Sequence, residues 1–104
     1  MPYHAAVMYP NEHDITFDET YYINTHMPLV DEVWKPLGMT NWKVVKYTHS
    51  FDGTPSKYLI AAHLEWESEQ AFQSALKAPQ SSRVFEDIPK FTNKSPISLA
   101  GSNL

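Results

Sequence analysis

The sequence predicts an α+β fold in which a four-stranded antiparallel sheet carries helices on one face. Three observations lead to this prediction. Two short apolar runs are typical of buried strands, two segments repeat apolar residues at helical spacing, and turn residues separate these elements. The expected order is strand, helix, strand, strand, helix, strand (βαββαβ), and right-handed crossovers then place the first and third strands in the centre. At 104 residues, the chain is expected to form one domain over residues 1–104.

The first strand and the first helical region lie in the N-terminal part of the sequence. Residues 3–9 form an apolar run that ends at a proline, as expected for a strand buried on both faces. Asp18 is a suitable N-cap for the following helix, and Gly38 ends it. Because proline lacks an amide and its ring collides with a carbonyl group of the preceding turn, Pro28 predicts a bend or restart near His26. One face of this helix carries Tyr22, His26, Val30, Val33, Trp34 and Leu37.

The remaining elements are predicted from the same kinds of signal. Residues 41–51 are rich in β-branched and aromatic residues but contain two lysines, which is typical of an edge strand. Asp52 and Gly53 predict a turn and an antiparallel return into a second buried strand over residues 58–66. The C-terminal part is expected to contain a helix between Ser68 and Pro79, a short helix over residues 81–88 and a weak edge strand over residues 96–100.

The two central strands are apolar on both faces, although the helices can cover only one of them. An uncovered apolar face needs a partner, and the same face of a second copy is the simplest one. A chain of this size also has little room for an enclosed pocket of its own. The sequence therefore predicts a homodimer.

Composition excludes several classes of protein. The three glycines are too far apart for a dinucleotide or phosphate loop, and the absence of cysteine excludes disulfides, zinc fingers and thiolate nucleophiles. A net charge of -4 is the wrong sign for nucleic acid or an anionic membrane. No metal-binding or cofactor-binding motif is present, so neither a metal nor a cofactor is expected. We find no targeting segment and no membrane span, which favours a cytoplasmic protein.

His26 is the main candidate for chemistry, because it lies on the apolar helical stripe beside the expected break at Pro28. Burial and a nearby helix N-terminus disfavour the imidazolium ion and lower the pKa, so the neutral imidazole can act as a general base. Alternatively, His26 has a structural role and hydrogen-bonds the backbone groups that Pro28 leaves free.

Other aromatic and histidine side chains are candidates for binding a substrate. Tyr22 lies one turn before His26 on the same face and can donate to a carbonyl or phenolate oxygen, whereas Tyr21 points about 100° away. Core packing is the alternative role for both tyrosines. Tyr9, Trp34 and Trp66 are expected to form the walls of a substrate pocket. His63 lies on a central strand and should face either the interface between two sheets or a pocket.

One part of the first helical region is specific enough to compare with known families. It reads Phe17-Asp18-Glu19-Thr20-Tyr21-Tyr22, followed after three residues by His26-Met27-Pro28-Leu29. Further matching positions are Met8-Tyr9-Pro10-Asn11, Tyr58, Glu67-Ser68, Asp87-Ile88-Pro89 and Phe91-Thr92. Over nearly its whole length the sequence resembles the EthD-domain family. The resemblance implies a ferredoxin-like subunit whose sheet packs against that of a second subunit in a dimeric α+β barrel.

The resemblance also bears on function. The founding EthD protein is associated with bacterial ether degradation beside a cytochrome P450 system, and some fungal relatives are assigned dehydratase or decarboxylase steps in aromatic polyketide pathways. By this resemblance His26 is the expected functional residue. We therefore predict a cofactor-independent lyase or isomerase (dehydratase, decarboxylase or cyclase type) that acts on a hydrophobic, aromatic or polyketide-derived molecule. The alternatives are a non-catalytic binding protein that assists an oxidative pathway and a cofactor-independent monooxygenase.

Overall fold

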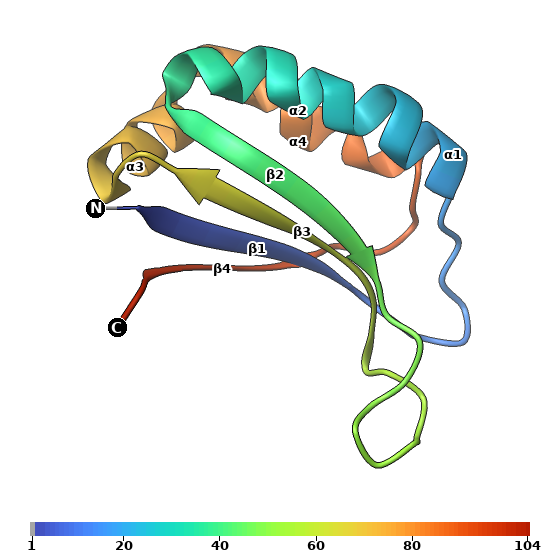
Figure 1. The fold of residues 1–104 in the computed structure, drawn as a ribbon. Coiled ribbons are helices and arrows are strands. Elements are labelled where there is room, and N and C mark those ends of the chain that lie inside the picture. The colour runs from blue at the N-terminus through green and yellow to red at the C-terminus, as the bar shows by residue number, and fades with distance from the viewer. Residues whose placement is uncertain (1) are drawn as a thin grey trace.

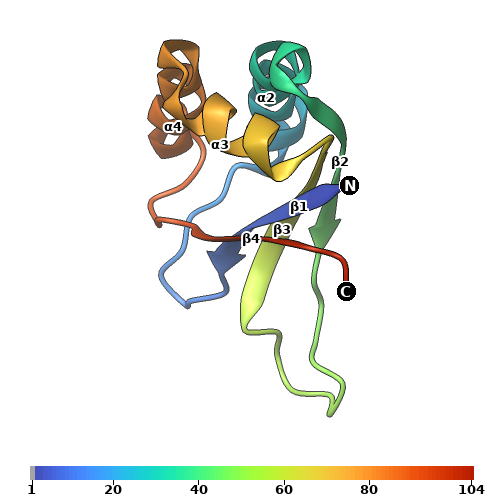
Figure 2. The same ribbon diagram turned by 90° about the vertical axis from the view of Figure 1, so that its left-hand side faces the viewer.

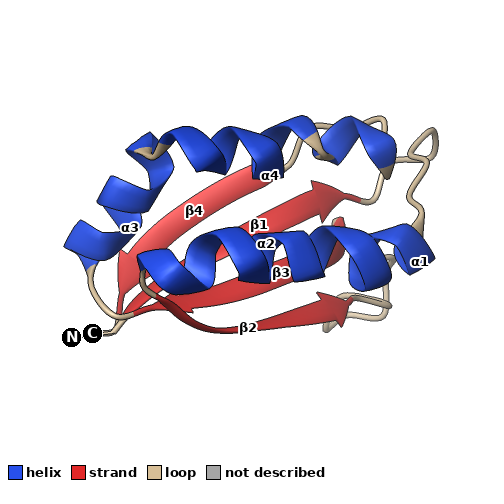
Figure 3. Ribbon diagram, turned by 90° about the horizontal axis from the view of Figure 1, so that it is seen from above, coloured by secondary structure: helices blue, strands red, loops and turns tan. Residues whose placement is uncertain are grey.

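The sheet has the predicted topology. The structure is a computed structural model that describes residues 2–104, and its strands follow the order β2-β3-β1-β4 with every neighbouring pair antiparallel. β1 (Tyr3–Pro10) and β3 (Tyr58–Trp66) are central, whereas β2 (Met39–Lys46) and β4 (Ile97–Ser102) form the edges. All helices lie on one side of the sheet, so the fold has two layers (Figures 1 and 3). The predicted α+β class and element order are confirmed.

The first helical region runs without a break from Glu19 to Leu37. It consists of α1 (Glu19–Tyr21), a π-helical turn (Tyr22–His26), α2 (Met27–Trp34) and a 3-10 turn (Lys35–Leu37). Asp18 caps it as predicted, because its side chain accepts a hydrogen bond from the Tyr21 amide. Pro28 is the second residue of α2, directly after the π-helical turn.

The π-helical turn is how the helix accommodates Pro28. Proline has no amide to donate to the carbonyl of Asn24, so the α-helical pattern of hydrogen bonds cannot continue through this position. The amide of Met27 instead reaches back five residues to the carbonyl of Tyr22. The predicted bend or restart near His26 thus takes the form of one wider turn, and the turn ends at His26 itself.

The second helical region comprises α3 (Glu69–Lys77) and α4 (Ser82–Glu86), with 3-10 turns at Pro79–Ser81 and Ile88–Lys90. Ser68 caps α3 as predicted, by accepting a hydrogen bond from the Ala71 amide. The short helix expected over residues 81–88 is therefore only partly α-helical. Pro79 and Pro89 in the flanking 3-10 turns explain this, because proline favours the start of a new helical turn over continuation of the old one.

The predicted boundaries of two strands, β2 and β4, were wrong. β2 begins at Met39, immediately after Gly38, and ends at Lys46 rather than extending over residues 41–51. Gly38 has a φ of 115°, which lets the chain reverse directly from helix to strand. Beyond Lys46 the chain leaves the sheet in a long loop to β3 (Figure 1). The last strand covers Ile97–Ser102 rather than residues 96–100, because Ser102 still pairs with Tyr3.

The core lies between the helices and the sheet. Alternate residues of each strand face the helices, and Tyr9, Leu64 and Trp66 are buried there against Val30 and Trp34. The opposite face of the sheet carries no helix (Figure 2). Exposed Ile97 and Leu99 belong to that face, which we call the open face. No helix within residues 2–104 is long and apolar enough to cross a membrane.

Candidate active site

A hydrogen bond joins His26 and Asp87 inside the helical layer. The distance from His26 Nδ1 to Asp87 Oδ2 is 2.9 Å, and both side chains are at least nine-tenths buried. His26 comes from the end of the π-helical turn, and Asp87 comes from the short connection after α4. Since an ionised carboxylate can only accept, Nδ1 carries the proton and Nε2 carries the free lone pair.

Asp87 uses its second oxygen to bind Tyr21. The Tyr21 hydroxyl donates to Asp87 Oδ1 over 2.8 Å. Lys90 Nζ lies 3.7 Å from the same oxygen but is largely exposed. Two hydrogen-bond donors from the first helical region therefore hold one carboxylate from the second, which fixes the orientation of the His26 ring.

The charge states of this group follow from its surroundings. Burial lowers the pKa of His26 below 6.5 and outweighs the opposing effect of the Asp87 carboxylate. Burial alone would raise the pKa of Asp87, but the hydrogen bonds from His26 and Tyr21 hold that pKa below its usual value. The hydrogen bond to Asp87 raises the pKa of Tyr21. At neutral pH the group therefore consists of a neutral imidazole, a carboxylate and a phenol.

His26 borders an apolar cavity of about 100 Å³ between the helices and the sheet. Besides His26, the polar side chains that line it are Tyr9, Tyr22 and Ser98. Phe85 and Ser98 are exposed, so they mark the open end of the cavity between α4 and β4. The remaining lining residues are Val7, Met27, Val30, Trp34, Ala62, Leu64, Val84, Ile88 and Pro96.

Aromatic rings surround His26 on its other sides. Tyr22 stacks on it with ring centroids 5.5 Å apart and planes at 14°, and Phe91 packs at 4.5 Å. Tyr9 and Phe17 complete the cluster by edge contacts with Tyr22. These contacts fix the imidazole in place and keep water away from it, which is the physical origin of its lowered pKa.

The structure places the other predicted site residues at three different locations. Tyr9, Tyr22 and Trp34 line the cavity with His26. Trp66 is completely buried against Trp34 and lies outside the cavity lining, so the structure does not support its predicted place as a pocket wall.

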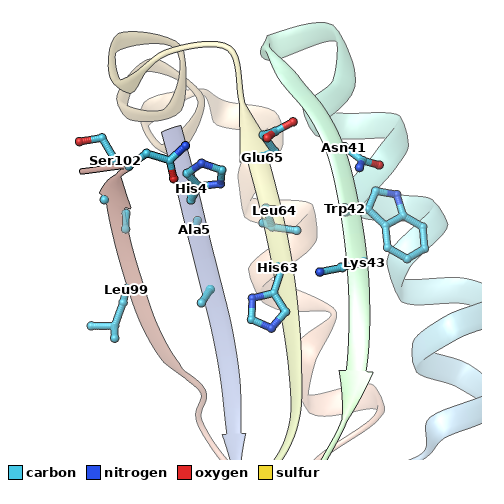
Figure 4. Close-up of a pocket in the computed structure, with 14 residues that line it drawn as sticks. His4, Ala5, Asn41, Trp42, Lys43, His63, Leu64, Glu65, Leu99 and Ser102 are labelled. Carbon is cyan, nitrogen blue, oxygen red and sulfur yellow. The ribbon is translucent and has the colours of Figure 1, made fainter. Parts of the chain in front are cut away.

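His63 lies on the open face of the sheet, away from His26. It lines a broad hollow of about 500 Å³ together with His4, Lys43 and Glu65 (Figure 4). Its Nε2 lies 3.0 Å from the Tyr47 hydroxyl. The structure thus places His63 on the face where the sequence predicts an interface, and not in the His26 cavity.

Sequence reasoning identified Asp87 only as a position that matches the EthD pattern, and it assigned Tyr21 core packing but no place in the chemistry. Asp87 follows Val84 by three residues, so it shares the buried side of the predicted short helix, and that position is the signal that could have identified it. Tyr21 binds Asp87, whereas Tyr22 stacks on His26. Asp87 reaches both Tyr21 and His26 because each of its oxygens binds a different residue.

No group of three or more metal-ligating side chains occurs within residues 2–104. What the site does contain is a buried neutral imidazole whose free nitrogen is held in position by a carboxylate. Such a pair can remove a proton and stabilise the resulting imidazolium ion.

Comparisons with known proteins place this geometry in a structural group. No family model and no curated protein matches the chain. An EthD-like protein from Ralstonia eutropha matches at 24% identity with a TM-score of 0.86, over 97% of this chain and 90% of that one. An EthD family protein from Bacillus halodurans matches at 21% identity with a TM-score of 0.79, over the full length of both chains.

The chain has the fold of the EthD-like proteins. The same fold extends to SnoaB, a cofactor-independent oxygenase from Streptomyces nogalater, which matches at 8% identity with a TM-score of 0.68 over 99% of this chain and 93% of that one. The EthD-like fold is therefore shared with at least one enzyme described as working without a cofactor.

Proposed function

We propose that this EthD-like protein is a cofactor-independent enzyme in which His26 removes a proton from an apolar substrate. The observation that carries the proposal is the hydrogen bond between His26 Nδ1 and Asp87 at the wall of the cavity. A neutral imidazole that a carboxylate orients, with its other nitrogen free at the wall of an apolar space, is the arrangement that a general base requires.

The proposed step is proton transfer from a carbon next to a carbonyl group. The electron pair of the C–H bond becomes the C=C bond of an enolate, the carbonyl π pair moves to oxygen, and the proton goes to His26 Nε2. Asp87 stabilises the imidazolium ion that forms. Loss of water from the neighbouring carbon, or reprotonation at another carbon in an isomerisation, can follow from such an enolate, which fits the dehydratase and isomerase reactions predicted from the sequence.

The walls of the cavity restrict the substrate to a hydrophobic molecule. The lining includes Trp34, Phe85 and Met27 and contains no lysine, arginine or carboxylate. A charged substrate would lose its hydration there without compensation. An aromatic or polyketide-derived compound fits this environment.

The test is hydrogen–deuterium exchange at the methyl group of 2′-hydroxyacetophenone in D₂O, followed by NMR. The wild type is expected to accelerate exchange, and His26→Gln is expected to lose about a hundredfold or more of that acceleration. His63→Gln is the matched control, because it removes a histidine of the other face, and it is expected to exchange at the wild-type rate. Equal rates for His26→Gln and the wild type would contradict the proposal.

Other outcomes would point to the alternative functions. Binding of the ketone without accelerated exchange would favour a non-catalytic binding protein for an oxidative pathway. Oxygen consumption with an electron-rich phenol would favour a monooxygenase; SnoaB, which shares the fold, is described as a cofactor-independent oxygenase.

We also infer that two copies pack through the open faces of their sheets. Apolar side chains of all four strands share this face in adjoining rows, namely Ala6, Met8, Val45, Ala61, Ile97 and Leu99. Ile97 and Leu99 are 44% and 61% exposed in the single chain. Covering such a face removes apolar surface from water, and closed two-fold packing is the usual way to do so.

Sedimentation measures this association. Ile97→Glu is expected to shift the protein from dimer to monomer, because it introduces charge into the interface. Ile23→Glu is the matched control, since Ile23 is also 44% exposed but lies on the helical layer. A wild type that is monomeric at high micromolar concentration would rule out the dimer.

A further inference from the structure

Two tyrosine hydroxyls in the His26 cavity have no hydrogen-bond partner among the described residues. Tyr9 and Tyr22 are each only 1% exposed, and both line the cavity. Within residues 2–104, the fully enclosed side-chain nitrogens and oxygens without a partner are His4 Nε2 and Trp66 Nε1. The two hydroxyls are therefore not fully enclosed, and the cavity is the free space that their residues border.

The two tyrosines and His26 form a continuous row. Tyr9 comes from β1 and meets Tyr22 edge to face, with ring centroids 5.9 Å apart and planes at 82°. Tyr22 in turn stacks on His26 at 5.5 Å. Strand and helix thus contribute one tyrosine each to the cavity that the proposed base also lines.

Both hydroxyls are protonated at neutral pH. Burial raises the pKa of Tyr22, and burial together with the neighbouring Tyr22 raises that of Tyr9. Each is therefore a hydrogen-bond donor. Buried tyrosine hydroxyls usually have a hydrogen-bond partner, so two without one among the described residues are donors available to an acceptor that enters the cavity.

We propose that Tyr9 and Tyr22 form a two-donor site for a single oxygen of the substrate, which is an enolisable ketone or a phenol. This inference rests on the proposed function of His26 as the base. As His26 takes the proton, negative charge develops on that oxygen, and two donors placed in an apolar cavity stabilise it. The cavity lining holds no cation that would do this instead.

The size of the cavity limits which part of the substrate enters. Its volume of about 100 Å³ is smaller than the roughly 150 Å³ cavity that admits benzene. Only the reacting end of a larger aromatic molecule fits beside the hydroxyls. The rest of the molecule lies at the open end, where Phe85 is 47% exposed and offers an aromatic surface.

The test uses 4-nitrophenol, whose absorption spectrum distinguishes phenol from phenolate. The wild type is expected to bind it as the phenolate, with the proton on His26. Tyr9→Phe and Tyr22→Phe are each expected to weaken binding about tenfold, as loss of one hydrogen bond to a charged oxygen predicts. Tyr3→Phe is the matched control, because Tyr3 lies on the same face of β1 but packs against Phe72 outside the cavity.

The outcomes separate this inference from the proposed function. If His26 is the base but the two tyrosines do not bind the substrate oxygen, 4-nitrophenol still binds as the phenolate, and at least one of Tyr9→Phe and Tyr22→Phe retains wild-type affinity. If the two tyrosines bind the oxygen but His26 does not take the proton, 4-nitrophenol binds as the neutral phenol, and Tyr9→Phe and Tyr22→Phe both still lose affinity. Absence of binding to the wild type at millimolar 4-nitrophenol overturns the two-donor site as well.

Discussion

His26 and His63 lie on opposite sides of the sheet, and their side chains have different hydrogen-bond partners. Burial lowers the pKa of both, but for His26 the Asp87 carboxylate opposes burial, whereas for His63 the nearby Lys43 reinforces it. His26 has a carboxylate as its partner, and His63 has the hydroxyl of Tyr47. Two histidines with pKa values shifted in the same direction therefore have different capacities for proton transfer.

The difference shows what a buried base requires. A neutral imidazole is available at both positions, but a base must also tolerate the charge that it acquires. Asp87 stabilises an imidazolium at His26, while Lys43 destabilises one at His63. The partner, more than the lowered pKa itself, distinguishes the candidate catalytic histidine from the one on the open face.

The largest expected effect comes from removing that partner. Asp87→Asn should reduce the exchange rate of 2′-hydroxyacetophenone about 10-fold to 100-fold, because the imidazole loses both its orientation and its stabilising charge. It should also move the acid limb of the pH–rate profile to lower pH, since the carboxylate raises the pKa of His26. Tyr47→Phe, which removes the partner of His63, should leave rate and profile unchanged. An unshifted profile in Asp87→Asn would contradict a positioning role.

The second-largest expected effect is on the pH dependence of the free energy of unfolding. The folded state holds His26 neutral to a lower pH than the unfolded state does, so below about pH 6.5 the unfolded chain binds more protons. The free energy of unfolding should therefore fall as the pH drops from about 6.5 towards the lowered pKa, and level off below it. Urea denaturation at several pH values measures this. His26→Gln should remove part of the loss, and an unchanged pH dependence would contradict the shift.

The smallest expected effects compare hydrogen bonds of the two faces. Trp34 Nε1 donates to Ser81 Oγ over 2.8 Å in a buried position. Ser81→Ala leaves that donor without a partner and should lower the free energy of unfolding by about 1–3 kcal/mol. Tyr47→Phe removes a part-buried hydrogen bond that water can replace. This substitution should therefore lower the free energy of unfolding by less than about 1 kcal/mol. Urea denaturation checks both, and the opposite order would show that the open face is the more tightly held.

The sequence was sufficient for the fold because local signals agree with the topology. The Asp18 and Ser68 caps and the apolar runs of residues 3–9 and 58–66 each determine one element, and the crossover rule orders them. The end of β2 was not predictable in this way. Residues 47–51 have strand propensity, but beyond Tyr47 their pairing is confined to an isolated bridge of His49 with Pro55 and one hydrogen bond from Ser50 to Thr54, so no continuous ladder forms.

The candidate site was only half predictable. His26 could be found because helical spacing places it on a buried stripe together with Tyr22. Asp87 lies 61 residues away, and no periodicity within one element relates the two. Trp66 lies outside the cavity because Trp34 packs against it. Strand alternation predicts that Trp66 faces the helices, but it does not predict this contact.

Because of the π-helical turn, a change in chain length can alter the site while the fold is kept. The turn contains one residue more than an α-helical turn, so a one-residue deletion between Tyr22 and His26 would tighten this turn, while Pro28 would still leave one carbonyl of the preceding turn without an amide partner. The buried face of α2 would remain where it is, but Tyr21 and Tyr22 would rotate by about 100° relative to His26. A single insertion or deletion at this turn can therefore create or abolish the arrangement of hydroxyls and base while the scaffold stays intact.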